Sequence, residues 1–415
     1  MARHETIAAV ATARGIAGVA VIRISGPEAH QVGATVAGRP LHTGLQFVRT
    51  PYDECLALVF NAPKSYTGED VVEFQCHGGE VTSSRILEAA FAAGARLARR
   101  GEFTERAFLA GKMTATQAES VLDLIHAKTV RAAEVAVEGL ANKTDEAMRA
   151  LYDRAIRLST EMEHLLDVSE EEIPSGTRAR LFAERTSLRA SLAAACVRAR
   201  EGRILRAGAC VVLAGPPNAG KSSLLNALLG EGRAIVSDIP GTTRDAIEAW
   251  ADFGGFPVRL VDTAGLRETA DEIEKEGVRR AEEAIQKADL VLDLGGEVKT
   301  AAKILRLHAK CDLSRGEGIN VSAKTGEGIE ELKEKIVDIL RASDVASDGE
   351  RPSERMHAAL ASALAHLDAL DGAPRDLVLA ANAVRAVAED LGAVIGATYS
   401  SDLMDGLFSR FCVGK

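Results

Sequence analysis

The sequence has no long apolar run, few cysteines and no excess of basic residues, and each shortage narrows the possible functions. None of the apolar runs approaches the ~20 residues that a helix needs to cross a bilayer. Charges in residues 1–5 interrupt the layout of a signal peptide. The six cysteines, at 55, 76, 196, 210, 311 and 412, form no Cys-x-x-Cys pair. They are typical of reduced thiols rather than of disulfides or a zinc site, so we expect a cytoplasmic protein.

The charge balance also limits the ways in which RNA can bind. Lysine and arginine total 50 against 60 aspartates and glutamates, a net charge of −10. Non-specific nucleic-acid binding usually needs a basic surface. Contacts with RNA therefore have to come from a local patch or from a second protein. Residues 96–100, which include three arginines, are one candidate patch, and a solvated helix end explains them equally well.

A chain of 415 residues, 47% hydrophobic and 27% charged, is ordinary for a soluble protein and too long for one core, so we expect two or three domains. The segment from Gly215 to Ser222 then matches the phosphate-loop pattern G-x-x-x-x-G-K-[ST]. Residues 210–214 predict a strand before it, and residues 223–229 predict a helix after it. Backbone N–H groups and Lys221 would hold the phosphates, and Ser222 would ligate Mg²⁺. The sequence therefore predicts nucleotide binding.

Two switch-like motifs follow in the order that is typical of translation-factor-type GTPases. Residues 241–245 resemble a first switch, in which Thr243 would complete the Mg²⁺ coordination. A predicted strand at 258–261 leads to the second motif, residues 262–265. Leu266 stands where Ras-type enzymes have a glutamine that orients water. Another group must do this, and the acids of residues 268–274 are candidates, although acids also favour the first turn of a helix.

The guanine-reading motif is incomplete. Its best match is residues 309–312, in which Lys310 and Asp312 are present but Ala309 replaces the usual asparagine. Asp312 can still accept hydrogen bonds from guanine, and residues 322–324 follow at the expected distance. We therefore predict GTP rather than ATP, bound with lower affinity.

Both ends of the chain carry further motifs, at residues 18–26, 65–73, 101–109 and 408–415. Two large apolar residues, Phe408 and Phe411, predict that the tail docks rather than frays. The final Cys-Val-Gly-Lys is a poor prenylation signal because it ends in lysine. Together with the GTPase motifs, these stretches closely resemble the bacterial MnmE (TrmE) family of tRNA modification GTPases over essentially the whole chain.

The expected fold is multidomain α/β. An N-terminal α+β domain at 1–113 is predicted from strand-like runs at 17–24, 55–60 and 71–76 and a helix at 80–93. Helical periodicity at 114–206 and again at 343–415 surrounds a Ras-like P-loop GTPase domain at 207–342. We interpret the two helical parts as one domain that contains the GTPase domain as an insertion, with residues 167–176 as a loop and 343–350 as a linker.

The resemblance implies a potassium-stimulated GTPase that forms a homodimer. It would act with the FAD protein MnmG (GidA) to add a carboxymethylaminomethyl or aminomethyl group at C5 of wobble uridines in certain tRNAs. The one-carbon unit would come from a 5,10-methylene- or 5-formyl-tetrahydrofolate bound in the N-terminal dimerisation domain. FAD would enter only through the partner. The alternative is a GTP-gated switch in ribosome assembly without modification activity, which the N-terminal motifs and the terminal residues disfavour.

The resemblance also implies roles for individual residues. Tetrahydrofolate contacts fall on Arg23, Glu73, Lys112 and Lys415, and potassium ligands on Asn218, Ser237, Ile239 and Thr242. Magnesium ligands are Ser222 and Thr243. Glu274 would position the attacking water, Arg267 would hold the second switch, Lys221 would assist catalysis, and Cys412 is a possible secondary nucleophile. The full GTP-binding set is Asn218, Ala219, Gly220, Lys221, Ser222, Ser223, Ser237, Asp238, Ile239, Pro240, Gly241, Thr242, Thr243, Asp262, Thr263, Ala264, Gly265, Lys310, Asp312, Ser322, Ala323 and Lys324.

Overall fold

The computed structural model describes most of the chain. The described residues are 5–13, 15–230, 234–235, 248–262, 279, 282–296, 298, 300, 302–342, 352–372, 376–395 and 406–415. They fall into two compact units. The first comprises the described parts of 1–122, 350–352 and 398–415, and the second those of 123–349 and 353–397.

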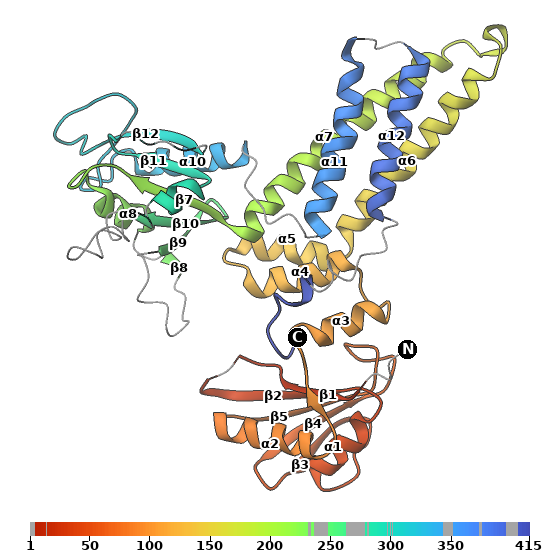
Figure 1. Cartoon of the computed structure of the whole chain (residues 1–415), viewed down its shortest axis with the longest axis vertical. Coiled ribbons are helices and arrows are strands. Elements are labelled where there is room, and N and C mark those ends of the chain that lie inside the picture. The colour runs from red at the N-terminus through yellow and green to blue at the C-terminus, as the bar shows by residue number, and fades with distance from the viewer. Residues whose placement is uncertain are drawn as a thin grey trace. The chain divides into compact units, whose positions relative to one another are not determined.

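The first unit is built on a six-stranded sheet of order β3-β4-β5-β2-β1-β6. All neighbouring strands are antiparallel except β1 and β6. The strands are β1 (Ile7–Val10), β2 (Ala17–Ser25), β3 (Gly44–Arg49), β4 (Glu54–Phe60), β5 (Val71–Gly78) and β6 (Arg96–Leu97). One face of the sheet packs against α1 (Ala29–Ala37) and α2 (Glu80–Ala92) in a single apolar core (Figure 1).

The opposite face of this sheet carries the predicted site residues Arg23 and Glu73. Side chains alternate between the two faces of a strand, and Ile22, Ile24, Val72 and Phe74 all point into the helix-covered core. The residues between them therefore point the other way. On that side Ile7 and Ala9 of β1 pack with Phe103 of α3 (Glu102–Leu109) and with Tyr66 and Val413.

The C-terminal tail docks in the first unit, as its two phenylalanines predicted. Phe408 and Phe411 are 4% and 1% exposed and pack with Ala118 and Leu122 of α4 (Ala115–His126). The ring centroid of Phe408 lies 6.4 Å from that of Phe108 and 5.9 Å from that of Phe411. Arg100 pairs with Val413 in an isolated bridge, which attaches the end of the chain to the start of α3.

The second unit contains a helical bundle made from two separate stretches of sequence. Its helices are α5 (Val130–Leu140), α6 (Lys143–Leu166), α7 (Thr177–Ala207), α11 (Pro352–Asp368) and α12 (Leu377–Ile395), with short 3₁₀ turns at Glu170–Glu172 and Ala369–Gly372. A single apolar core joins α6 and α7 with α11 and α12, and these four helices lie side by side in Figure 1. The helices before and after the GTPase domain in sequence therefore share one core, and the domain bounds 114–206, 207–342 and 343–415 stay predictions. Within the described residues, no helix is long and apolar enough to span a membrane.

The interrupting domain is an α/β layer structure with a seven-stranded sheet of order β13-β12-β11-β7-β10-β9-β8. The strands from β13 to β10 are parallel, and β9 and β8 continue the sheet antiparallel. The strands are β7 (Ala209–Ala214), β8 (Ala234–Ile235), β9 (Glu248–Phe253), β10 (Phe256–Asp262), β11 (Leu290–Asp293), β12 (Lys303–Ala309) and β13 (Ile319–Val321). Helices α8 (Lys221–Leu229) and α10 (Ile329–Arg341) contribute to the core. The carboxyl ends of parallel strands are where such folds bind ligands.

Candidate functional site

The predicted phosphate loop leaves the fully buried strand β7 and enters α8, as the motif requires. Gly215 and Gly220 have φ of 148° and 97°, and Asn218 has a left-handed φ of 62°. The glycines permit these turns without the strain that a Cβ would cause. α8 begins at Lys221, directly after the loop, and a helix N-terminus that follows a glycine-rich loop is the arrangement that binds phosphate.

Two polar contacts define the phosphate end of this site. The Lys221 ammonium is buried and donates to the carbonyls of Gly215 and Pro216, at 3.0 and 2.8 Å. It is therefore folded back over the loop. The Ser222 hydroxyl donates to the fully buried carboxylate of Asp262 at 2.6 Å. Hydroxyl and carboxylate oxygens are ligands that Mg²⁺ prefers, so this pair is suited to hold the ion beside bound phosphates.

The candidate base-binding residues converge from the ends of β12 and β13. Lys310 has a left-handed φ of 61°, and its ammonium donates to the carbonyl of Asn218 at 2.9 Å. The Ser322 hydroxyl, which is fully buried, donates to the Asp312 carboxylate at 2.7 Å. Lys310 therefore lies across the phosphate loop, and Ser322 in the loop after β13 fixes the Asp312 carboxylate.

The remaining predicted nucleotide residues divide into two groups. Ala219 lies in the phosphate loop, Ser223 is exposed on α8, and Ala323 and Lys324 lie in the turn after β13. The others lie outside the described residues. They are Ser237, Asp238, Ile239, Pro240, Gly241, Thr242, Thr243, Thr263, Ala264, Gly265, Arg267 and Glu274.

A second polar site occupies the open face of the N-terminal sheet. Arg23 of β2 is directly opposite Glu73 of β5 in the strand register, and its Nε donates to the Glu73 carboxylate at 2.6 Å. Both side chains are mostly buried. The Arg23 guanidinium carbon lies 5.1 Å from the ring centroid of Tyr66 and 5.5 Å from that of Phe103. Its Nη1 is buried without a hydrogen-bond partner, which is costly unless a ligand supplies an acceptor.

The docked tail brings Lys415 to the same place. The Phe103 N–H donates to the Lys415 carbonyl at 3.3 Å. Burial and then the positive charge of Arg23 lower the pKa of the Lys415 ammonium, while Glu73 acts in the opposite direction. The strands therefore contribute Arg23 and Glu73 to this site, and the tail contributes Lys415. This arrangement favours an anionic ligand, because an anion would relieve the repulsion between the cations.

Lys112 and Cys412 are the two remaining candidates of the first unit. Lys112 is exposed and donates to the carbonyls of Pro63 and Ser65, at 2.8 and 2.6 Å, so it holds the segment that carries Tyr66. Cys412 is exposed in the tail.

The basic segment at 96–100 is not an unpaired patch. Arg96 pairs with Glu5 and Glu102, and Arg99 pairs with Glu102 and Glu105. Neighbouring carboxylates therefore offset the charge of two of its three arginines, and a contact between this segment and RNA stays a prediction.

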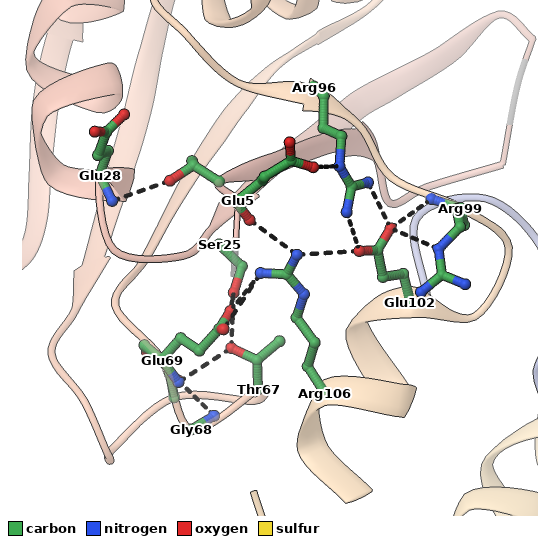
Figure 2. A network of polar contacts seen from close by, with 12 residues as sticks. Glu5, Ser25, Glu28, Thr67, Gly68, Glu69, Arg96, Arg99, Glu102 and Arg106 are labelled. Atoms are coloured by element: carbon green, nitrogen blue, oxygen red, sulfur yellow. Dashed lines mark hydrogen bonds and ion pairs between the residues drawn. The ribbon is translucent and has the colours of Figure 1, made fainter. Parts of the chain in front are cut away.

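Sequence reasoning assigned no role to several residues that shape the N-terminal site. Tyr66 and Phe103 contact Arg23. Glu69, Glu102 and Arg106 form an ionic network, which Figure 2 shows. All five fall within the motifs at 65–73 and 101–109, so the sequence motifs pointed to the right segments. The sequence did not indicate that these two segments lie next to each other in the fold.

The phosphate loop, the Ser222–Asp262 pair and the convergence of Lys310, Asp312 and Ser322 define a P-loop GTPase. Two family models match nearly the whole chain. The MnmE helical domain matches residues 116–412, and the N-terminus of the GTP-binding protein TrmE matches residues 6–112.

Curated relatives match along nearly their whole lengths. The tRNA modification GTPase MnmE of Symbiobacterium thermophilum is 42% identical over 457 residues, covering 99% of this chain and 100% of the relative. The protein of the same name from Xanthomonas campestris pv. campestris strain B100 is 41% identical and covers 100% of both. The chain belongs to the MnmE family of GTPases. A solved FeoB G-domain from Methanococcus jannaschii is 23% identical with a TM-score of 0.24, covering 32% of this chain and 97% of that one, and supports no functional argument.

Proposed function

We propose that the chain is a potassium-stimulated GTPase that works with MnmG in tRNA modification. The reaction adds a carboxymethylaminomethyl or aminomethyl group at C5 of the wobble uridine, with the one-carbon unit taken from a tetrahydrofolate. The observation that carries the proposal is the presence of two dissimilar sites in one chain. One is a phosphate loop with a Ser222–Asp262 pair, and the other is the buried Arg23–Glu73 pair beside Lys415.

At the nucleotide site the chain holds and orients phosphates. The N–H groups at the start of α8 and the Lys221 ammonium bind the β- and γ-phosphate oxygens. Lys221 reaches them by exchanging its two loop carbonyls for phosphate. Ser222, supported by Asp262 and joined by Thr243, holds Mg²⁺. The ion, when bound, neutralises charge that develops between the two phosphates.

Base selection depends on Asp312. Its carboxylate accepts hydrogen bonds from the guanine N1–H and amino group, and Ser322 fixes its orientation at 2.7 Å. Lys310 lies along the base from its anchor on Asn218. Ala309 cannot supply the hydrogen bond that asparagine gives in the usual motif, so we expect GTP to bind less tightly than it does to a complete motif.

The potassium site would comprise Asn218, Ser237, Ile239 and Thr242. When bound there, the ion adds positive charge beside the phosphates, as an arginine finger does in other GTPases. Glu274 positions the attacking water, which compensates for Leu266, and Arg267 holds the second switch. Hydrolysis then drives approach and separation of the two GTPase domains of a homodimer.

The N-terminal site suits tetrahydrofolate on physical grounds. The folate supplies a hydrogen-bond acceptor for the unpartnered Nη1 of Arg23, and its negatively charged glutamyl tail suits the Lys415 ammonium. Glu73 pairs with the amino-pyrimidinone edge of the pterin, and Lys112 is a further contact with the folate. The bound folate supplies the one-carbon unit, and Cys412, which is exposed, is a secondary candidate for attack on the uridine.

The test of this proposal compares GTP turnover in KCl and NaCl at matched ionic strength. We expect strong acceleration by potassium in the unmodified chain and none in Glu274→Ala. Unchanged potassium acceleration in Glu274→Ala would contradict the role of that residue. Equal rates in both salts, together with GTP-dependent sedimentation with ribosomal subunits and no folate binding, would instead support a ribosome-assembly switch.

A further inference from the structure

A single buried arginine joins the two segments that flank Arg23. The Arg106 side chain is 5% exposed. Its Nη1 donates to both carboxylate oxygens of Glu69, at 3.2 and 2.9 Å. Its Nη2 donates to the Glu5 carbonyl at 2.9 Å and to the Glu102 carboxylate at 3.0 Å. Figure 2 shows this guanidinium between the Glu69 loop and the start of α3.

The Glu69 branch fixes the loop that carries Tyr66. Glu69 accepts a hydrogen bond from the Ser25 hydroxyl at 2.8 Å, and Ser25 contacts the Thr67 hydroxyl at 2.8 Å. The Ser65 hydroxyl donates to the Glu69 carbonyl at 2.5 Å. The residues on both sides of Tyr66 are therefore tied, through Glu69, to Arg106.

The Glu102 branch fixes the turn that carries Phe103. The Glu102 side chain is 3% exposed and accepts hydrogen bonds from Arg96, from the Arg99 N–H and from Arg106. Burial raises the pKa of Glu102, but these donors outweigh it and hold the pKa at about 2. The carboxylate is therefore ionised at neutral pH. The next residue, Phe103, contacts Arg23 with its ring and the Lys415 carbonyl with its N–H.

We propose that Arg106 is a positioning residue for the ligand of the N-terminal site. By binding Glu69 and Glu102 at once, it sets the places of the Tyr66 and Phe103 rings, and these rings hold the Arg23 guanidinium with Nη1 directed to the ligand. The inference rests on the proposed folate function and adds a residue that acts through Arg23. Arginine is needed because its planar fork can bind two carboxylates, whereas a lysine ammonium offers a point charge.

The experiment measures binding of 5-formyltetrahydrofolate to the full chain by titration calorimetry. We expect Arg106→Gln to weaken binding roughly tenfold, the lower end of the loss seen when the outer partner of a metal-ligating side chain is removed. Arg106→Lys retains the positive charge and should lose less folate affinity than Arg106→Gln. It can be measured instead if Arg106→Gln folds poorly. GTP turnover, which depends on the other unit, should be unchanged in both variants.

A double-variant cycle separates positioning from general destabilisation. The Arg23→Lys variant lacks the guanidinium that Arg106 is proposed to position. Adding Arg106→Lys to it should therefore weaken folate binding by less than a further twofold, because both changes act through the Arg23 guanidinium. A purely structural role would lower affinity equally in both backgrounds. Such equal losses would overturn the inference.

Arg99→Gln is the matched control. It removes an arginine from the same cluster, but Arg99 binds Glu102 and Glu105 from the exposed side, and its N–H bond to Glu102 remains. We expect its folate affinity to match that of the unmodified chain. Unaltered folate affinity in both Arg106 variants would overturn the role of Arg106 but leave the folate function standing. An unmodified chain that binds no folate would overturn both.

Discussion

The docking of the C-terminal tail gives the sharpest prediction about the N-terminal site. Phe411 is 1% exposed and packs with Phe408, Ala118 and Leu122. Four residues later, the Lys415 ammonium lies within electrostatic range of Arg23 and Glu73. The substitution Phe411→Ala should therefore release the tail and remove a cation from the site, although it changes no residue that contacts the proposed ligand.

The burial of Phe411 sets the magnitude. Truncation of a fully buried phenylalanine to alanine costs about 3–5 kcal/mol, which includes the cavity that remains. Because 1.4 kcal/mol corresponds to a factor of ten, the docked fraction of the tail should fall relative to the undocked fraction by roughly 100-fold or more. Tetrahydrofolate binding should weaken, since the tail must redock before Lys415 can contribute.

Hydrogen exchange provides the assay. The Phe103 N–H donates to the Lys415 carbonyl, and the Gly101 N–H donates to the Cys412 carbonyl. Both amides should exchange faster in Phe411→Ala, whereas GTP turnover should not change. Leu109→Ala removes an apolar side chain that is 65% exposed on α3 and serves as the control. Unchanged exchange at Phe103 together with unchanged folate affinity would refute the account of tail docking.

Three further predictions concern single side chains. Lys221→Ala should abolish measurable GTP turnover, because the loop loses its only side-chain cation, and binding of a fluorescent GTP analogue should weaken. Asp312→Asn should favour xanthosine triphosphate over GTP in competition assays, because an amide donates where the carboxylate accepted. The pKa of Glu102 is about 2 in the folded chain against 4.5 normally, so its ion pairs stabilise fully above about pH 4.5 and are lost as the pH falls towards 2. Urea unfolding should therefore show that Glu102→Gln is less stable at pH 7 and less sensitive to acid.

The GTPase domain was largely predictable because its motifs are local. The expected strands at 210–214 and 258–261 are the buried parts of β7 and β10, and the expected helix at 223–229 forms most of α8. In each of these elements, a short apolar run adjoins a motif whose residues need a particular backbone conformation. The predicted loop at 167–176 likewise separates α6 from α7.

The elements that were missed have weak local signals. Helix α1 contains Gly33, a poor helix former, yet a Cβ at that position would lie 2.9 Å from a Val72 methyl group. Strand β3 lies at the sheet edge, with Leu45 and Phe47 exposed, so its apolar residues do not alternate as a half-buried strand would. Tertiary packing decides both elements.

The ionic network around Arg106 could not be predicted from local sequence. Its partners lie at positions 5, 69 and 102, and only Glu102 has the spacing of neighbours on one helix. A buried arginine is rare unless it is paired, and nothing in the sequence indicates which arginine is buried. The fold brings the motifs at 65–73 and 101–109 together, and the network exists only in that arrangement.

Nucleoside mass spectrometry of tRNA tests directly whether the chain takes part in tRNA modification. Substrate tRNA that lacks the wobble modification would be incubated with the chain, MnmG, GTP, methylene-tetrahydrofolate and a nitrogen donor, either glycine or ammonium. We expect a C5-modified wobble uridine that requires the chain and is lost in Lys221→Ala and in Arg23→Ala. Unmodified uridine with active MnmG and full GTP turnover would contradict this expectation.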